Sequence, residues 1–454
     1  MTCREIPFDT DRTGRAGTTG LAGRDFLLLL AASLGMFSNH AVLLSLVPLW
    51  SVEGGAGNGG AGATTGTVMA VTVFVQLWMS RLTRRFGARV LLVAGALLLG
   101  VPTFGYAASA ALPWVLAVSA VRGAGFGIVT VAGAALVAAL IAPDRRGRAL
   151  GLYGLAVGLP QVLMLPAGLW AAERYGFVPV FVAAGLASVL AAPLVLGMSR
   201  SPALAPSRSS AAPRERVPAR TAVRVLRRAV PRAVGRSGGP WTALFASACA
   251  LGGVASFLPL ALKDSSAAAV ALFALSAAII AGRWGAGVWS DRFGAGRMAA
   301  PGLAVAALGM AGLAVAATMA DEPGAGATAV AVIAATAYGL GFGLVQNDTL
   351  VVMFHRSGPD GHGTASAAWN IAFDAGTGAG AVMIGLVSGL LGISGSFAVA
   401  AAGIAVALPI AWLDARAHST GQDGRTGRDS DTGGDSDTGG DGHTGRDRDS
   451  ARPM

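Results

Sequence analysis

The sequence predicts an all-α membrane protein whose twelve transmembrane helices form two pseudo-symmetric six-helix bundles. Three observations support this prediction. Of the 454 residues, 53% are hydrophobic and 13% are charged, which is more apolar surface than a soluble fold could bury, so the excess must face lipid. Apolar runs long enough to cross ~30 Å of hydrocarbon as helices recur about twelve times. A pattern of glycines and polar residues also occurs twice along the chain.

The apolar runs fall into two groups of six, separated by a polar stretch. The first six are expected near 25–50, 61–80, 90–109, 112–141, 149–171 and 177–198, and the second six near 241–262, 267–289, 298–319, 327–354, 364–391 and 395–413. The run from Phe26 to Trp50 is too long for the apolar part of a signal peptide, so we expect it to remain as the first span. The 66 glycines suit helices that pack closely within a membrane.

The repeated pattern relates the two groups. Its first copy consists of Gly123, Gly125, Phe126, Gly127, Pro143, Asp144, Gly147 and Ala149, and its second copy of Gly339, Gly341, Phe342, Gly343, Pro359, Asp360, Gly363 and Ala365. Every pair is 216 residues apart, as Pro143 and Pro359 are. An internal duplication of long apolar segments is typical of transporters built from two related halves.

The net charge of +10 comes almost entirely from arginine, and the arginines follow the membrane spans. Alternate connectors carry them: Arg81, Arg84, Arg85, Arg89, Arg145, Arg146, Arg148, Arg292, Arg297 and Arg356. The other connectors, such as 51–60 and 320–326, are nearly free of arginine. The positive-inside rule therefore places the first set, and with an even number of spans both termini, in the cytoplasm. It also explains the basic charge without a nucleic-acid partner.

These boundaries divide the chain into five parts. We expect a cytoplasmic N-terminal tail at 1–24, a six-helix bundle at 25–199, a basic cytoplasmic linker at 200–240, a second bundle at 241–414 and a disordered cytoplasmic tail at 415–454. Within the linker, 220–230 fits either a short basic helix on the anionic leaflet or a solvated segment. The two cysteines, Cys3 and Cys249, lack metal-ligand spacing, so no metal or other cofactor is expected.

The connector after the second span of the second half carries a gating motif. It runs from Gly287 through Asp291, Arg292 and Gly294 to Arg297, and it resembles the G-x-L-a-D-R-x-G-R motif of the major facilitator superfamily. The first-half equivalent keeps Arg85 and Gly87, but has Ser80 and Arg84 where that family has Gly and Asp. In physical terms, an Asp at a helix terminus that pairs with Arg forms a latch holding one shape of the cytoplasmic gate.

The resemblance covers about 25–414 and implies two bundles around a central site that opens alternately to each side of the membrane. Within the superfamily the chain is most similar to bacterial drug or metabolite:proton antiporters, which implies a monomer in the bacterial plasma membrane. The Gly/Pro-rich motif that those antiporters carry in their fifth span is not intact here. Direction of transport therefore stays open.

Arg122 lies inside the fourth apolar run, where a charge costs ~2.5–3.5 kcal/mol and must face a cavity or a partner. The segment from Arg122 to Gly127 resembles the R-x-x-q-G-x-G motif of proton-coupled exporters, with Ala124 in place of Gln. The resemblance implies a role in proton movement. The alternative is a structural arginine bonded to backbone carbonyls.

Two further residues are candidates for proton coupling. Asp374 lies about ten residues from the expected cytoplasmic end of its span, or ~15 Å, which is close to the midplane. A carboxyl group there could take up and release a proton during transport, or it could be a buried Asp held by neutral donors. His40, near the middle of the first span, could titrate near neutral pH or serve only in packing.

Polar side chains elsewhere in the spans are candidates for the cargo cavity. These are Asn39, Gln161, Gln346, Asn347, Asp348 and Asn370, with Gln76 a weaker one. In the superfamily spans 1, 4, 7 and 10 line the cavity, which implies that Asn39, Gln346, Asn347 and Asp348 face the pathway.

The sequence thus predicts a secondary active transporter that exports a small organic molecule by alternating access, driven by protons. The alternative is a proton symporter or uniporter for uptake of a sugar, organic acid or siderophore. We do not expect an enzyme, because the spans contain no HExxH motif and Asp348 and Asp374 lack the flanking motifs of intramembrane aspartyl proteases.

Overall fold

The computed structural model describes residues 23–141, 145–199, 238–262, 264–320, 324–357 and 362–430. These residues are helical apart from short connections, and no strand occurs among them. The tail before residue 23, the linker at 200–237 with its expected basic helix at 220–230, and residues 431–454 lie outside the described residues.

The first half crosses the membrane six times. Its helices are α1 (Arg24–Glu53), α2 (Asn58–Phe86), α3 (Ala88–Gly100) continued by the 3₁₀ helix η1 (Val101–Ala108), α4 (Leu112–Leu140), α5 (Arg146–Tyr175), and α6 (Phe177–Val189) continued by α7 (Ala191–Leu196). The change from α3 to η1 coincides with Pro102, which has no N–H to offer the α-helical ladder.

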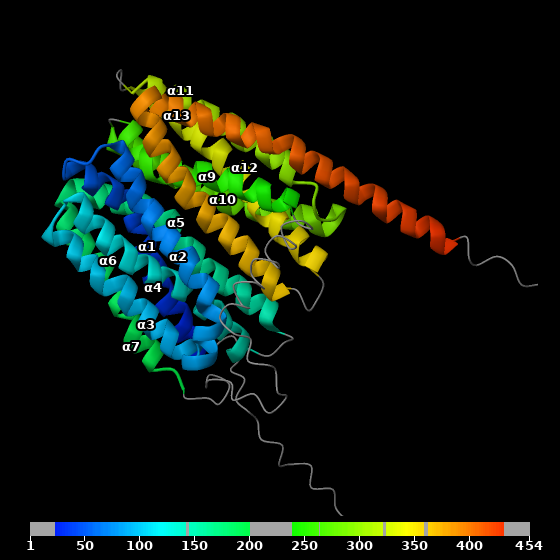
Figure 1. The fold of residues 1–454 in the computed structure, drawn as a ribbon, viewed down its shortest axis with the longest axis horizontal. Coiled ribbons are helices and arrows are strands. Elements are labelled where there is room, and N and C mark those ends of the chain that lie inside the picture. The colour runs from blue at the N-terminus through cyan, green and yellow to red at the C-terminus, as the bar shows by residue number, and fades with distance from the viewer. Residues whose placement is uncertain are drawn as a thin grey trace, which may run out of the picture. The chain divides into compact units, whose positions relative to one another are not determined.

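The second half consists of α9 (Gly238–Ala261), α10 (Ser265–Phe293), α11 (Ala299–Thr318), α12 (Ala325–Ser357) and α13 (His362–Ser430). The apolar part of α13, Ala365–Arg416, has 52 residues, more than twice what one crossing needs. It is interrupted at Gly392, whose φ of +69° is not helical, and the chain turns back there (Figure 1). α13 therefore supplies two spans, and the prediction of an all-α fold with twelve spans is confirmed.

α13 also continues to Ser430, into the segment at 415–454 for which we expected disorder. Its described residues from Leu413 to Ser430 belong to a second unit of the chain. The helix there contains Gly421, Gly424 and Gly427 and no apolar stripe, so its composition does not account for it.

The repeated glycines make equivalent contacts in the two halves. A Cβ on Gly123 of α4 would collide with the carbonyl oxygen of Val68 on α2, and one on Gly339 of α12 with that of Leu275 on α10. The other repeated glycines behave alike: Gly127 meets Thr72, Gly343 meets Ile279, Gly125 meets Leu99 and Gly341 meets Ala306. Each pair of partners is 207 residues apart (275 − 68, 279 − 72, 306 − 99). The duplication thus encodes one three-helix packing used twice.

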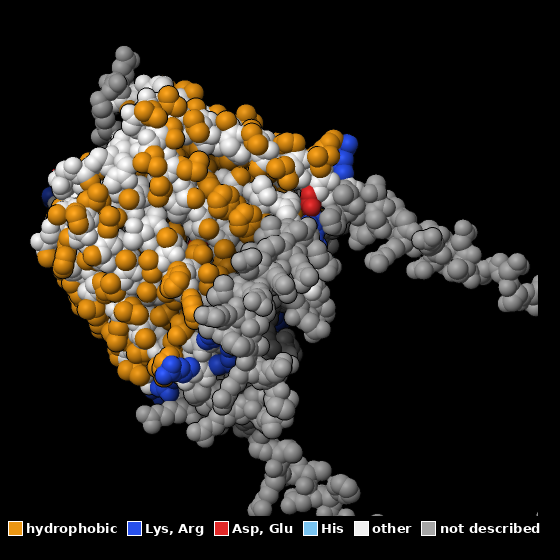
Figure 2. Space-filling view, in the orientation of Figure 1, with side chains coloured by type: hydrophobic (Ala, Val, Ile, Leu, Met, Phe, Trp, Pro, Cys, Tyr) orange, Lys and Arg blue, Asp and Glu red, His pale blue; other side chains and the backbone are white. Residues whose placement is uncertain are grey.

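The outer surface of the bundle is apolar. Large hydrophobic side chains such as Leu390, Trp284 and Leu308 are 87%, 75% and 73% exposed, and hydrophobic side chains cover most of the face seen in Figure 2, with arginines at its margins. A surface of this kind suits lipid contact. We call the side with the α2–α3 and α10–α11 connections the arginine-rich side and the opposite one the arginine-poor side.

Candidate functional site

Arg122 lies at the centre of a hydrogen-bond network inside the first half. It is 2% exposed and donates from Nε to Thr103 Oγ1 (3.2 Å), from one terminal nitrogen to Tyr106 Oη (3.2 Å) and from the other to Asn39 Oδ1 (3.0 Å). Asn39 in turn donates to Thr103 Oγ1 and to the carbonyl of Ala184 (2.8 Å). All these partners are neutral, so the network joins α4, η1, α1 and α6 around a single buried cation.

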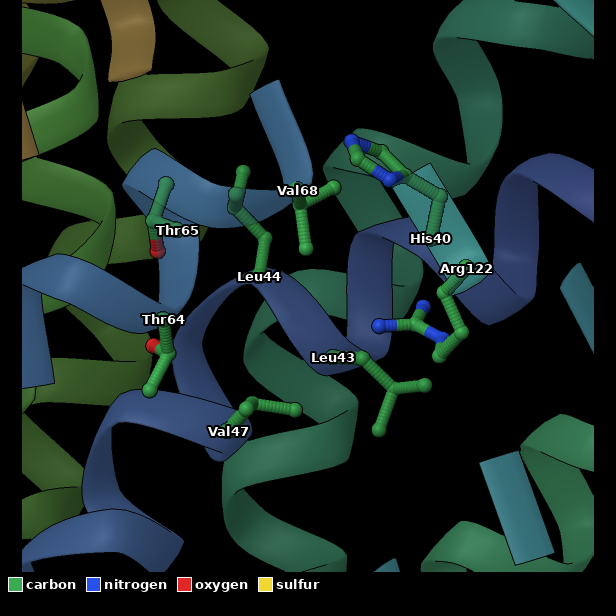
Figure 3. A pocket seen from close by; sticks show the side chains of 8 residues that line it. All are labelled: His40, Leu43, Leu44, Val47, Thr64, Thr65, Val68 and Arg122. Atoms are coloured by element: carbon green, nitrogen blue, oxygen red, sulfur yellow. The ribbon is translucent and has the colours of Figure 1, made fainter. Parts of the chain in front are cut away.

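His40, next to Asn39 on α1, borders a small cavity beside this network. Its ring lies flat on the ring of Phe126, with centroids 3.6 Å apart and planes 7° apart. Neither ring nitrogen has a hydrogen-bond partner within the described part of the chain. The cavity is lined by His40, Leu43, Leu44, Val47, Thr64, Thr65, Val68 and Arg122. His40 and Arg122 lie on one side of it, and Thr64 and Thr65 on the other (Figure 3).

Asp374 is 3% exposed and connects the two halves. Its Oδ2 accepts a hydrogen bond from Gln76 Nε2 at 2.7 Å, from α13 to α2. The same nitrogen lies 3.4 Å from Thr130 Oγ1 on α4, whose hydroxyl donates to the carbonyl of Gly127. Gln76, a weaker candidate for the cargo cavity, is therefore a direct partner of Asp374, a candidate for proton coupling. Its only signal in the sequence is an amide within an apolar run.

The contact between α2 and α13 extends from this pair to the arginine-poor side. Gly62 packs against the carbonyl of Ala381, and Gly378 against the side chain of Met69. Thr65 adds a hydrogen bond of 2.9 Å to Ser256 on α9. These contacts hold the two halves together over the part of the helices that lies toward the arginine-poor side.

Beyond Gln76, toward the arginine-rich side, the same face of α2 is exposed. Ser80 and Arg84, one and two turns further along α2, are exposed, and so is Ala367, about two turns before Asp374 on α13. Of the contacts named here between these two helices, that of Gln76 with Asp374 lies nearest the arginine-rich side. The glycine contacts between these two helices therefore lie on the arginine-poor side of the Gln76–Asp374 pair.

Asp348 does not face the cavity, and that expectation needs correction. Its Oδ1 accepts from the backbone N–H of Gly296 (2.8 Å), and its Oδ2 from Met298 (3.2 Å) and Ala299 (2.9 Å). These N–H groups belong to the α10–α11 connection and the start of α11, where a carboxylate satisfies orphan donors and the helix dipole. The side chain is 1% exposed and fixes a loop.

The gating motif lies on that same connection. Gly294 ends α10 with φ +86°, and Gly87 ends α2 with φ +80°, a backbone conformation that disfavours other residues. Asp291 and Arg292 are exposed, and Asp291 forms no ion pair with the residues the structure describes, so the expected latch is not formed in this conformation. The carboxylate that does hold the connection is Asp348.

Arg85 lies over the ring of Phe86, 5.2 Å from its centroid.

The remaining candidates differ in their surroundings. Asn370 donates to the carbonyl of Ser366 in its own helix (2.8 Å). Gln346 is 6% exposed, and its Oε1 has no partner. Asn347 lies near Gly287, where an added Cβ would have ordinary space, so Gly287 is not needed for close packing here. Gln161 forms no hydrogen bond within the described chain. No cluster of metal ligands is found there either.

Two related bundles of membrane-length helices that enclose buried polar groups are typical of a membrane transporter rather than an enzyme. The model of the Major Facilitator Superfamily matches residues 27–381, and the chain belongs to that family. Alternating access, which the family's fold supports, is the mode of transport.

Solved structures agree on the fold. The chain is similar to a mutant of the nucleoside transporter NupG (TM-score 0.68, 13% identity, 86% of this chain and 99% of that one). It is also similar to an inward-facing, unoccupied bacterial homologue of the human lysosomal transporter Spinster (TM-score 0.65, 16% identity, 86% and 96% covered). No curated protein matches the chain.

Proposed function

We propose that this transporter exports a small organic molecule in exchange for protons, with Asp374 as the coupling group and the arginine-rich side in the cytoplasm. The observation that supports this best is the position of Asp374. It is buried in a membrane helix, where the halves meet, and among the described residues a neutral amide is the one group that forms a hydrogen bond with its carboxyl group. Burying a carboxylate with so little compensation is unfavourable, whereas burying the neutral acid is not.

Protonation of Asp374 would therefore favour the conformation in which α2 and α13 are in contact, and deprotonation one in which they separate and water reaches the carboxylate. A proton bound from outside would be carried to the inward-open conformation and released into the cytoplasm. Cargo would then bind to the deprotonated protein and be carried to the outside. Arg122, held by neutral partners on the first half, would keep a fixed positive charge near this pathway.

Everted vesicles test both coupling and direction. Respiration acidifies their lumen, which quenches a weak-base dye, and a panel of small organic molecules is then added outside. An exporter moves its cargo inward and protons out, so a cargo restores the fluorescence, whereas in Asp374→Asn vesicles it does not. If no compound in the panel releases protons, but preloaded compounds leave the lumen together with protons, the transporter is the uptake symporter. A cargo effect that persists in Asp374→Asn would exclude Asp374 as the coupling group.

A further inference from the structure

We propose that Gln76 is the positioning residue that allows Asp374 to exchange its proton while the two halves remain in contact. This inference deepens the proposed function and rests on it. Gln76 is on α2 of the first half and Asp374 on α13 of the second, 298 residues further along the chain. The hydrogen bond between them therefore joins the two halves and also contacts the carboxyl group that would titrate.

The orientation of the Gln76 amide is defined by its neighbours. Its nitrogen faces two acceptors, Asp374 Oδ2 at 2.7 Å and Thr130 Oγ1 at 3.4 Å. Thr130 uses its own proton on the carbonyl of Gly127, so its oxygen is left to accept. With both amide protons directed to acceptors, the N–H toward Asp374 stabilises the carboxylate form.

The other end of the same amide suits the acid form. Gln76 Oε1 is buried and has no hydrogen-bond donor. A carboxylate has no proton to offer it, but a protonated Asp374 carries an O–H within one side-chain length. An amide can therefore pair with either protonation state, through its N–H in one case and its carbonyl oxygen in the other. An apolar side chain at this position could pair with neither, and would leave a carboxylate bare.

The other groups around the carboxyl do not replace this role. Thr130 of α4 and Phe342 of α12, which packs on Phe373, are neutral. On α9, the titratable residue in this region is Cys249. Its backbone packs against Gly380, which follows Asp374 on α13. Within the described residues Asp374 has no ion pair, and the hydrogen bond donated by Gln76 is the one side-chain contact that favours its charged form.

The position of the pair gives the exchange a direction. The glycine contacts of α2 with α13 lie on the arginine-poor side of the pair, whereas Ser80 and Arg84, on its arginine-rich side, are exposed. A proton can therefore leave toward the arginine-rich side while these glycine contacts persist. When the halves separate, Gln76 moves away with the first half, and water replaces it as the partner of Asp374.

The test measures protonation directly and needs no cargo. The full-length protein in detergent is titrated while the infrared absorption of protonated carboxyl groups is recorded, and the band absent from Asp374→Asn is assigned to Asp374. We expect Gln76→Leu to move the titration midpoint to higher pH by about one unit, a tenfold change in proton affinity, because the carboxylate loses a charge-assisted hydrogen bond. Gln76→Met, with similar volume, should do the same and covers the case in which Leu is not tolerated.

Thr72→Val is the matched control. Thr72 lies one turn from Gln76 on α2, is fully buried and bonds the carbonyl of Gly123 at 2.9 Å, so its loss removes a buried hydrogen bond without touching Asp374. In Thr72→Val the titration midpoint of the Asp374 band should equal that of the wild type. A wild-type midpoint in folded Gln76→Leu and Gln76→Met would overturn the role of Gln76 while leaving Asp374 as the coupling group. An Asp374 band that does not titrate in the wild type would overturn both.

Discussion

Arg122 on α4 and Asn39 on α1 are joined by a hydrogen bond of 3.0 Å in which the guanidinium donates and the side-chain oxygen accepts. The amide nitrogen of Asn39 then donates to Ala184 on α6, so the two residues connect three helices through one continuous chain of hydrogen bonds. Since Arg122 is the only charge among these groups, its stability within the membrane depends on how well the neutral partners surround it.

Arg122→Lys should therefore destabilise the protein although it keeps the charge. A lysine has no planar fork to reach Thr103, Tyr106 and Asn39 together, so buried acceptors are left unpaired, at about 1–3 kcal/mol. The free energies of unfolding of purified Arg122→Lys, Asn39→Leu and the double variant give the interaction energy between the two residues. We expect the double variant to lose less stability than the sum of the single ones, whereas strict additivity would mean that the bond is of no consequence.

The repeated glycines lead to a second prediction. Gly339→Ala places a methyl group on the carbonyl oxygen of Leu275, and overpacking of this kind costs about 1–3 kcal/mol. Gly285→Ala, on α10, is the control because no atom lies within 4 Å of its added Cβ. It should be neutral or stabilising by up to ~1 kcal/mol, since alanine is the better helix former. Equal melting temperatures for the two variants would contradict the proposed packing.

The fold was predictable because its determinants are local. A span needs only enough apolar residues in sequence, and the end of one run at 391 and the start of the next at 395 bracket the turn at Gly392. Gly87 and Gly294 could be recognised from their place after basic helix ends. Asn39 and Arg122 were both candidates from the sequence, because each is a polar or charged residue within an apolar run and each lies in a segment that resembles the superfamily.

The pairings within the site were not predictable, because they depend on how distant helices meet. Nothing in the sequence around Asp374 indicates that Gln76, 298 residues earlier, supplies its hydrogen bond. The same holds for Asp348. A carboxylate in a membrane helix suggests a cavity, and only the path of the α10–α11 connection shows that backbone N–H groups reach it first.

Asp348 should be needed for stability, and Asp291 for the rate of the transport cycle. Asp348→Asn loses acceptor capacity for three backbone N–H groups, so we expect a loss of about 1–3 kcal/mol and faster proteolysis of the α10–α11 connection. Asp291 is exposed in this conformation, so Asp291→Asn should change stability by less than about 0.5 kcal/mol.

Transport separates the two roles further. The gating motif predicts that Asp291 pairs with arginine in the conformation closed toward the arginine-rich side. Asp291→Ala should then slow exchange between conformations, which spin-label distances across that side can follow. A rate equal to that of the wild type would refute the latch at Asp291, and a stable Asp348→Asn variant would refute the cap at Asp348.

The connection between α9 and α10 leads to a prediction for pH. Asp264 precedes α10, outside the spans, and its carboxylate accepts from Ser266 Oγ (2.6 Å), Ser266 N (2.9 Å) and Ala267 N (3.3 Å). The Ser266 hydroxyl foremost, and then the two backbone N–H groups, lower the pKa of Asp264 below its ordinary value of 3.8. A group whose pKa is lower in the folded state stabilises that state above the unfolded value, and its contribution is lost as pH falls through the folded one.

The wild type should therefore lose part of its thermal stability as the pH is lowered below about 4, where unfolded Asp begins to bind its proton. Asp264→Asn keeps an oxygen that can cap the helix but cannot titrate, so its melting temperature should fall less over the same range. Asp264→Ala should melt at lower temperature than the wild type at neutral pH, because the cap itself is gone. If the three proteins share one dependence of melting temperature on pH, other carboxyl groups determine acid stability and the cap at Asp264 does not contribute.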